Sequence, residues 1–514
     1  MKKDISEKKA RVIGLVLGLI LSSIFQVLNW TTGHNWGGDF SQYIMQGMSV
    51  ANGTIEEFIK QSETIVNSSS YPIAPITYPW GFPILLSLTY SFFGLNLIIF
   101  KSIILFFFIS FLIVLWFLYE EDLDISERLI LISLFAFNPY LLKFGDNILS
   151  DIPFLFFSTL SIFIITKLKE KRSQFNTILY CFILGLCFMI STTIRSHGIL
   201  LPILYFSILS LIFLQNYFPK INFFSIQLLS FKSFLSSRMR TFCYLLPIII
   251  FILFALYFST ILPNRQEAHF EVFESINVKS IFNNILYYSV VLKDFFSSQS
   301  NMRYFLYNID IVGFAIYVLT IPFVLLGLKN KWKISPVIII YTVITLVLYT
   351  TYPARQGLRY ILPVLPFYIY FLLIGLRSLN VYKKNLVTRK NFFSYILLLV
   401  FFFFSIFQIY ENAQNGFKVK NGPYNKESQE LFNYIKTSVP KNNTIIFFKP
   451  RVLTLFTERN SVLYNKIDDF KIREWYVVNK KSQLILNQKR NELFDKFPAK
   501  ISYENSRFIL YKFD

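Results

Sequence analysis

Blocks of about twenty apolar residues alternate with short polar segments along most of the chain. A helix of about twenty residues is long enough to cross a hydrocarbon core of about 30 Å. Three such blocks are Leu97–Leu118, Thr241–Leu262 and Phe392–Tyr410. Few charges interrupt them, and Lys101 lies near the end of its block, where we expect its side chain to extend to the polar interface. The first stretch, Val12–Leu28, lacks a small-x-small cleavage site, so we expect an uncleaved span. The pattern predicts a polytopic helical membrane protein.

The Lys and Arg residues are concentrated in five polar segments, as is typical of cytoplasmic loops. These segments are residues 2–11, Lys167–Arg172, Lys220–Arg240, Lys329–Lys333 and Arg377–Lys390. The alternating segments are then outside, and they are residues 31–80, Lys143–Asp151, Thr192–Gly198, Pro263–Tyr304, Thr351–Tyr360 and the tail after Glu411. We therefore expect about eleven to twelve crossings of the inner or plasma membrane, with a cytoplasmic N-terminus and an outer C-terminal tail.

The apolar stretch Gly81–Leu95 does not fit this parity. If residues 31–80 are outside, both of its ends are outside, and it is short for a crossing. Two interpretations stay open at this point. The stretch is either a re-entrant or surface-lying hairpin, or a tilted span whose partner lies elsewhere in the sequence.

Composition supports the membrane class and argues against other classes. The chain is 54% hydrophobic, its mean hydropathy is +0.48, and only 16% of its residues are charged, against about 25% in a soluble domain. The net charge of +21 lies in short loops, without a basic stripe interleaved with exposed aromatic residues, so we expect no nucleic-acid partner. Cys181, Cys187 and Cys243 all lie in apolar segments, which argues against a disulfide framework.

Two segments outside the apolar blocks have ordinary polarity. In the outer loop, residues 31–80, GGDFSQYIMQGMSVANG predicts a short amphipathic helix that ends at Gly53. In the tail, residues 412–514, we expect a helix over Ser428–Thr437. Strand-like runs follow it at Thr444–Phe448, Ser461–Tyr464, Ser482–Leu486 and Phe508–Tyr511. The prediction is a mainly α membrane protein, with a transmembrane domain over residues 1–411 and a small C-terminal α/β domain.

Charged residues gather at the outer ends of the spans, where they are functional candidates because charge beside a membrane is costly. Four clusters carry them: GGDFSQY with Asp39 and Tyr43, KFGDNILSD with Lys143, Asp146 and Asp151, TTIRSH with Arg195 and His197, and YPARQGLRY with Arg355 and Arg359. A guanidinium fork holds phosphate oxygens, and a carboxylate accepts a proton from an attacking hydroxyl. The clusters therefore predict a site for an anionic lipid headgroup and a hydroxyl nucleophile.

The order of motifs resembles the GT-C superfamily of polyprenyl-phosphate-sugar-dependent glycosyltransferases, nearest its protein O-mannosyltransferase and aminoarabinose transferase branch. The matching segments are GGDFSQYIMQGMSVANG, YPWGFPILLSL, NPYLLKFGDNILSDIPF, LRYILPVLPF and KPRVLTLFTERNSV. The resemblance implies a GT-C helical bundle in which Asp39 is the catalytic carboxylate and Asp151 a second acidic position. It also implies that Arg359 and Arg195 hold the donor phosphate. Several relatives have an Asp-Glu pair in the first loop, whereas Asp39 precedes Phe40, which leaves the subfamily open.

Each candidate also has a purely structural explanation. Asp39 is equally placed to cap the helix of the outer loop, and Asp151 to cap the span that follows it. Arg355 and Arg359 are positioned to serve as interfacial anchors, and Tyr43 and Tyr78 to join an aromatic belt. The histidines, His34, His197 and His269, have no metal-ligand spacing.

We therefore expect an inverting glycosyltransferase that moves a hexosyl or pentosyl group from a polyprenyl-phosphate donor to a hydroxyl of an unidentified glycan, lipid or protein. No cofactor is required, and the sequence has no P-loop or Rossmann glycine pattern. A divalent metal is compatible with the acidic residues but not indicated by them. The alternative is a transporter or flippase for an anionic lipid-linked substrate, which predicts inverted repeats and polar residues near the midplane. A polymerase or ligase of surface polysaccharide would differ mainly in its acceptor.

Overall fold

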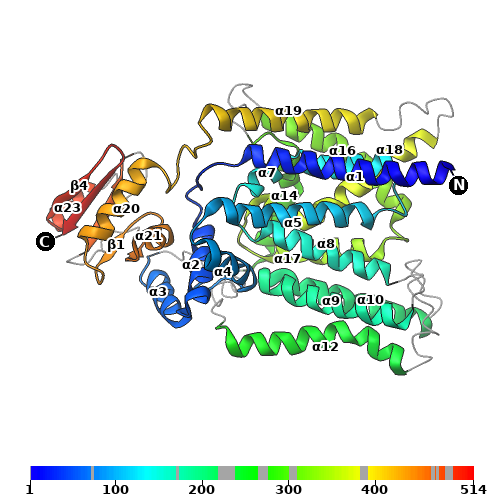
Figure 1. Cartoon of the computed structure of the whole chain (residues 1–514), viewed down its shortest axis with the longest axis horizontal. Helices are drawn as coiled ribbons and strands as arrows, with labels where there is room; N and C mark the ends of the chain where they lie inside the picture. The colour runs from blue at the N-terminus through cyan, green and yellow to red at the C-terminus, as the bar shows by residue number, and fades with distance from the viewer. Residues whose placement is uncertain are drawn as a thin grey trace.

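The computed structural model describes residues 2–70, 75–168, 173–217, 238–263, 276–299, 309–381, 392–464, 469, 474–480 and 490–513. A bundle of roughly parallel and antiparallel helices forms most of the molecule, and a small domain of strands and helices lies at one end of it (Figure 1). The N-terminus lies at the opposite end of the bundle (Figure 1). The chain is thus a polytopic helical protein with a C-terminal α/β domain, as the sequence predicts.

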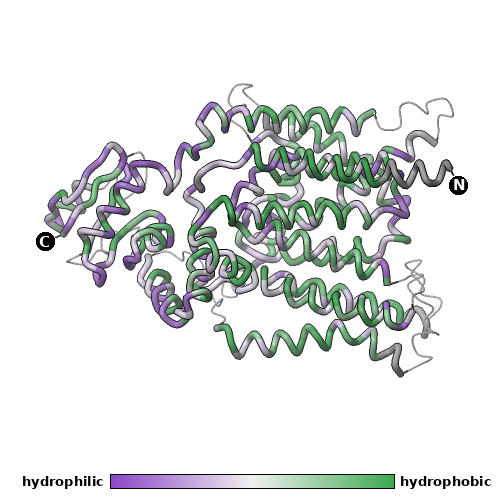
Figure 2. The backbone as a smooth tube through the Cα atoms, viewed as in Figure 1, coloured by the Kyte–Doolittle hydropathy of each residue, from purple (hydrophilic) through white to green (hydrophobic). Residues whose placement is uncertain are grey.

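Seven helices in the described residues are long and apolar enough to cross a membrane. Their apolar residues dominate the bundle (Figure 2). These helices are α1 (Lys2–Asn29), α5 (Leu97–Leu118), α9 (Gln174–Ile194), α10 (Leu200–Tyr217, preceded by η1, Ser196–Ile199), α12 (Arg238–Ile261), α16 (Ile309–Lys331) and α19 (Phe392–Gln414). An eighth span is formed if α6 (Ile125–Ala136) and α7 (Pro139–Gly145), which bend by 57°, are taken together. The chain is therefore an integral multi-pass membrane protein.

Shorter helices complete the bundle: α8 (Asp151–Lys167), α14 (Val278–Val291), α17 (Pro336–Thr351) and α18 (Leu365–Val381), together with η3 (Leu292–Phe296), η4 (Gly357–Arg359) and η5 (Leu362–Val364). The total of eleven to twelve crossings stays a prediction, because it depends on the shorter apolar helices.

The apolar stretch Gly81–Leu95, which did not fit the parity of the loops, forms α4 (Gly81–Phe93). It packs against α2 (Gly38–Asn52) at the small-domain end of the bundle, which favours the surface-lying interpretation (Figure 1).

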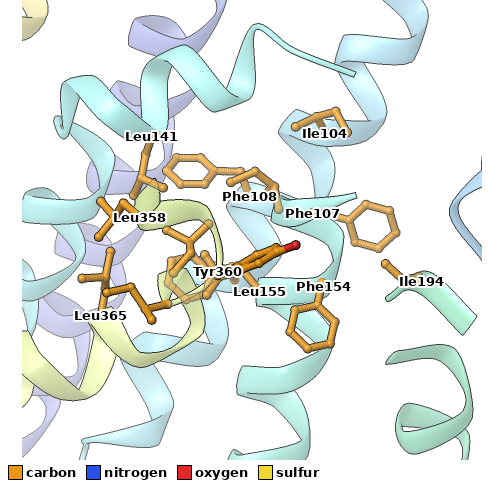
Figure 3. Packing of buried hydrophobic residues seen from close by; sticks show 14 of the residues in the cluster. Ile104, Phe107, Phe108, Leu141, Phe154, Leu155, Ile194, Leu358, Tyr360 and Leu365 are labelled. Atoms are coloured by element: carbon orange, nitrogen blue, oxygen red, sulfur yellow. The ribbon is translucent and has the colours of Figure 1, made fainter. Parts of the chain in front are cut away.

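Close packing holds the bundle together, because lipid offers no hydrophobic drive for helices to associate. At the crossing of α16 and α18, a Cβ at Gly327 would overlap the Phe371 carbonyl, and one at Gly375 would overlap the Phe323 carbonyl. Elsewhere aromatic and aliphatic side chains interlock. Figure 3 shows one such region, where the labelled side chains are Ile104, Phe107, Phe108, Leu141, Phe154, Leu155, Ile194, Leu358, Tyr360 and Leu365. This packed region includes Phe154, one turn after Asp151, and both neighbours of Arg359, so it provides a rigid base for both Asp151 and Arg359.

The small domain contains a five-stranded sheet in the order β2-β1-β3-β5-β4. Its elements are α20 (Lys426–Ser438), β1 (Thr444–Ile446), α21 (Pro450–Thr457), β2 (Asn460–Val462), β3 (Trp475–Asn479), α23 (Arg490–Lys496), β4 (Ala499–Glu504) and β5 (Phe508–Phe513). β1 pairs in parallel with β2 and β3, and β5 pairs antiparallel with β3 and β4. The predicted helix and three predicted strands are present, whereas Ser482–Leu486 lies outside the described residues.

The small domain is attached to the loop of residues 31–80 as well as to the spans. Trp36 inserts among its aromatic residues, 4.9 Å from the ring of Phe448, and donates from Nε1 to Asn421 Oδ1 at 2.7 Å. After α3 (Ile55–Asn67), the Ser70 amide donates to the Leu463 carbonyl at 2.9 Å. α21 also packs on α2, as Figure 1 shows. The loop between the first two spans and the tail therefore form a continuous layer at this end of the bundle.

Candidate active site

Asp39 lies in the first turn of α2, and its carboxylate is directed to other elements rather than to its own helix end. The N-cap is Gly37, and no side chain caps the helix. Oδ2 of Asp39 accepts a hydrogen bond from Arg359 Nη1 at 2.5 Å, and Oδ1 accepts one from the Tyr78 hydroxyl at 2.8 Å. The capping explanation for Asp39 is therefore wrong, although the carboxylate still benefits from the positive end of the helix dipole.

Asp151 is the first residue of α8, after the N-cap Ser150. Its side chain is only 1% exposed. Both of its oxygens accept from Arg359 Nε, at 2.7 and 2.8 Å, and Oδ1 also accepts from Arg195 Nη1 at 2.5 Å. No side-chain capping bond is made at this helix start. A buried carboxylate needs such partners, because an unpaired charge out of water is strongly destabilising.

Arg359 is the residue that joins the two carboxylates. It ends η4, which begins at Gly357, whose φ of +65° lies in the left-handed region that glycine adopts readily. Its Nη1 also approaches Gln356 Oε1 at 3.3 Å. Burial acts to lower the pKa of Arg359, but Asp151 and Asp39 outweigh it and hold the pKa above its ordinary value. Arg359 is thus a permanent cation with both acidic candidates as partners, and it does more than anchor a span end.

The same cation determines the charge state of Asp39. Burial acts to raise the pKa of this carboxyl, but Arg359 and the hydrogen bonds from Arg359 and Tyr78 lower it below its ordinary value. Asp39 is therefore ionised at neutral pH. With a side chain 29% exposed, it is also more accessible than Asp151. The site contains the carboxyl groups of Asp39 and Asp151 and the guanidinium groups of Arg195 and Arg359.

Tyr43 and Tyr78 lie beside the two acidic candidates. Tyr43 is buried one turn after Asp39, and its hydroxyl lies 2.8 Å from the Ser150 hydroxyl, next to Asp151 in the chain. The Tyr43 and Tyr78 rings are 4.9 Å apart. The aromatic-belt explanation is therefore wrong for Tyr43. α2 thus carries Asp39 and also contacts Ser150, the residue before Asp151.

The remaining candidates are Lys143, Asp146 and Arg355. Asp146 and Arg355 bond to residues other than Asp39, Asp151, Arg195 and Arg359. Asp146 accepts from Lys101 Nζ at 2.6 Å and from the Thr31 amide at 2.7 Å. Lys101 is fully buried and also donates to the carbonyls of Thr31 and Gly33, so the expectation that it extends to the interface is wrong. This ion pair fixes the chain between α1 and α2. Lys143 is exposed on α7.

Arg355 is exposed as well, but it has a defined position. Its Nε donates to Asn284 Oδ1 at 2.8 Å, and its guanidinium lies 4.9 Å from the ring centre of Tyr287. The Tyr287 hydroxyl accepts from the Gly357 amide at 3.0 Å. Arg355 therefore fastens the loop before Arg359 to α14.

Two residues that no motif role had singled out support the site. The His34 ring stacks on Phe40 with ring centres 3.9 Å apart, and its Nε2 accepts from the Ile148 amide at 3.3 Å. His34 therefore links the segment before α2 to the loop before α8. Arg451 of the tail lies 5.5 Å from the ring centre of Tyr78. Arg451 stands in the tail motif KPRVLTLF, but nothing in the local pattern indicates that it reaches another domain.

The acidic candidates form no metal site with their neighbours in the described residues. Across the ten described stretches of the chain, no three His, Cys, Asp or Glu side chains gather as a metal-holding group. Asp39 and Asp151 face a shared guanidinium instead. The arrangement offers a base, fixed cations and a boundary position between bundle and small domain.

Solved structures share the fold of this chain. ArnT from Cupriavidus metallidurans, bound to undecaprenyl phosphate, is 10% identical; the match covers 98% of this chain and 97% of that chain, with a TM-score of 0.58. The Archaeoglobus fulgidus oligosaccharyltransferase tethered with an acceptor peptide is 13% identical, over 98% of this chain and 74% of that one, with a TM-score of 0.56. Neither a protein-family model nor a curated protein sequence matches the chain.

A third solved structure has a similar fold. It is the archaeal oligosaccharyltransferase AglB from Archaeoglobus fulgidus in complex with an inhibitory peptide and a dolichol-phosphate. It is 13% identical over 88% of this chain and 64% of that chain, with a TM-score of 0.51. At such low identities the likeness is one of fold.

Proposed function

Starting from a chain with the GT-C fold, we propose that this protein is an inverting membrane glycosyltransferase. It transfers a sugar from a polyprenyl-phosphate donor to an acceptor hydroxyl at the outer membrane–water interface. One observation carries the proposal: Arg359 bridges Asp39 and Asp151 where the bundle meets the small domain. The solved relatives of this fold include one bound to undecaprenyl phosphate and one in complex with a dolichol-phosphate.

Asp39 is assigned the role of general base. The acceptor oxygen forms a bond to the anomeric carbon, its proton passes to Asp39, and the bond from that carbon to the phosphate oxygen breaks. The lipid leaves as polyprenyl phosphate, which carries away the electron pair. Asp39 suits the role because its lowered pKa keeps it ionised and because it is the more exposed of the two carboxylates.

Arg359 and Arg195 are assigned to the donor phosphate. Within the described part of the chain, neither Nη2 group has a hydrogen-bond partner, so each has N–H groups available for phosphate oxygens. Asp151 then acts as a positioning residue, since it holds both guanidinium groups in place before the substrate arrives. Positive charge that is fixed in advance stabilises the negative charge that develops on the leaving phosphate.

The transporter or flippase alternative fits the charge distribution less well. Such proteins place polar residues near the bilayer midplane at broken helices. Here Lys101 lies near the start of α5, Glu127 and Arg128 lie at the start of α6, and Arg377 lies near the end of α18. The charged groups of these described helices are thus near helix ends. This distribution favours the enzyme.

The test is to reconstitute the full chain in lipid nanodiscs and supply radiolabelled polyprenyl-phosphate sugars together with a crude outer-envelope acceptor fraction. We expect one donor to be consumed and its label to appear in an acceptor, and Asp39→Asn to abolish this. In liposomes, translocation of a fluorescent polyprenyl phosphate without any sugar transfer, unchanged in Asp39→Asn, would overturn the proposal in favour of a flippase.

A further inference from the structure

The two oxygens of Asp39 have different partners. Oδ2 faces the Arg359 guanidinium, while Oδ1 accepts from the Tyr78 hydroxyl at 2.8 Å. A guanidinium on one oxygen and a hydroxyl on the other leave the carboxylate little freedom to rotate. A base that must meet a proton in one geometry benefits from such restraint.

Tyr78 is itself held on α2 through its backbone. Its amide donates to Gln46 Oε1 at 2.9 Å, and Gln46 Nε2 donates back to the Tyr78 carbonyl at 3.0 Å. Gln46 is fully buried, and the Tyr78 ring packs on Tyr43 from the same helix. The hydroxyl therefore approaches Asp39 from a segment that is fixed to the helix carrying Asp39.

The tail fastens this segment from the other domain. Arg451, in the first turn of α21, is 3% exposed, and its guanidinium lies 5.5 Å from the ring centre of Tyr78. Its Nη2 donates to the Pro75 carbonyl at 2.6 Å. Burial acts to raise the pKa of Asp39, and Arg359, Tyr78 and, more weakly, Arg451 all lower it. A buried arginine of the tail thus packs on the residue that holds the base.

We propose that Tyr78 is a positioning residue for Asp39 and that Arg451 makes the tail a working part of the same site. This inference rests on the proposed function, since it concerns the base of that reaction. It implies that the small domain acts on turnover itself, through the path Arg451 to Tyr78 to Asp39, whatever part the domain takes in acceptor binding.

Tyr78→Phe is the direct test, because it removes one oxygen and keeps the ring. Tyr434→Phe is its matched control, since the Tyr434 hydroxyl bonds to Ser502 within the tail. In Tyr78→Phe we expect kcat to fall about tenfold, the scale of one hydrogen bond to a charged group, with the donor KM unchanged. The Asp39 carboxylate can be titrated by infrared difference spectroscopy, with Asp39→Asn as the subtracted reference. In Tyr78→Phe the midpoint of this titration should move to higher pH, because the ionised carboxylate has lost a hydrogen-bond donor.

Arg451→Lys tests the tail, since it keeps the charge and loses the planar group that packs on Tyr78. Its control is Arg459→Lys, a buried arginine whose bonds to Val439, Thr457 and Lys436 stay within the tail. We expect Arg451→Lys to lower kcat severalfold and to shift the same titration upward, and the control to leave both unchanged at equal folded yield.

The outcomes separate this inference from the proposed function. An unchanged titration and an unchanged kcat in Tyr78→Phe would overturn the positioning role. A wild-type chain that consumes no sugar donor would overturn the proposed function. The titration needs no turnover, so it decides in that case too whether Tyr78 and Arg451 hold Asp39.

Discussion

Arg359 Nε lies 2.7 and 2.8 Å from the two oxygens of Asp151, although the two residues are 208 positions apart in the chain. The same guanidinium reaches Asp39 through Nη1. Asp39 and Asp151, from segments far apart in the sequence, thus meet at one cation.

Arg359→Lys should weaken the binding of polyprenyl phosphate about tenfold, because an ammonium group keeps the charge but cannot hold two carboxylates and a phosphate with a planar fork. Binding to the purified protein in nanodiscs is the measurement. Arg377→Lys is the matched control, since Arg377 forms a similar fork to Glu127 away from the site. Equal loss of affinity in both variants would assign the effect to general stability.

The Lys101–Asp146 pair should matter for stability and not for chemistry. Lys101→Met leaves a carboxylate in buried surroundings without its cation, so the free energy of unfolding should fall by about 3 kcal/mol. Thermal denaturation in detergent measures the loss. Activity per folded molecule should stay near that of the wild type. A folded Lys101→Met protein without turnover would bring Asp146 into the active site.

Four of the site residues could be predicted from the sequence. Asp151, Arg195 and Arg359 are charges next to apolar blocks, and Asp39 is the acidic residue of the motif GGDFSQY. Their mutual bonding could not be predicted. It depends on how α2, α8, α9 and η4 pack, and no local pattern encodes that packing. The same reason explains the Lys101 error: a lysine near a span end is equally compatible with solvent and with a buried partner far along the chain.

In the small domain, too, some elements could be predicted from the sequence and others could not. The helix at Ser428–Thr437 was predictable from its amphipathic period, and α20 covers it. β3 and β4 were not predicted. β3 is buried along its whole length, so it lacks the alternation that marks a half-buried strand, and β4 carries mostly exposed and half-buried residues. Sheet pairing with β5 defines both strands.

Stability should depend on pH through His34. Burial lowers the pKa of this imidazole to about 3 from the ordinary value of 6.5, so the folded state resists protonation while the unfolded state accepts it. Stability is therefore full above pH 6.5 and declines as the pH falls towards 3, by about 2 kcal/mol between pH 7 and 5. His34→Gln should flatten this dependence in thermal denaturation measured across that range. An equally steep decline in the variant would exclude His34 as the cause.

The tail should face the outside and the segment 329–333 the cytoplasm. Single cysteines at Ser506 and Lys333, both exposed, are suitable reporters in a background without native cysteines. A membrane-impermeant maleimide added to intact cells should label the cysteine at 506, and the one at 333 only after lysis. The reverse pattern would place the Asp39 site in the cytoplasm and contradict an outer-face reaction.

Asp39→Asn tests the central claim most directly. Asparagine has nearly the same shape and its amide oxygen can still accept from Tyr78, but it cannot accept the acceptor's proton. We predict that turnover of the lipid-linked sugar falls at least about 10²-fold while thermal stability and donor binding are retained, and that Asp39→Glu keeps partial activity. Wild-type turnover in a folded Asp39→Asn protein would contradict the account, and Asp151 would become the first residue to test as the base.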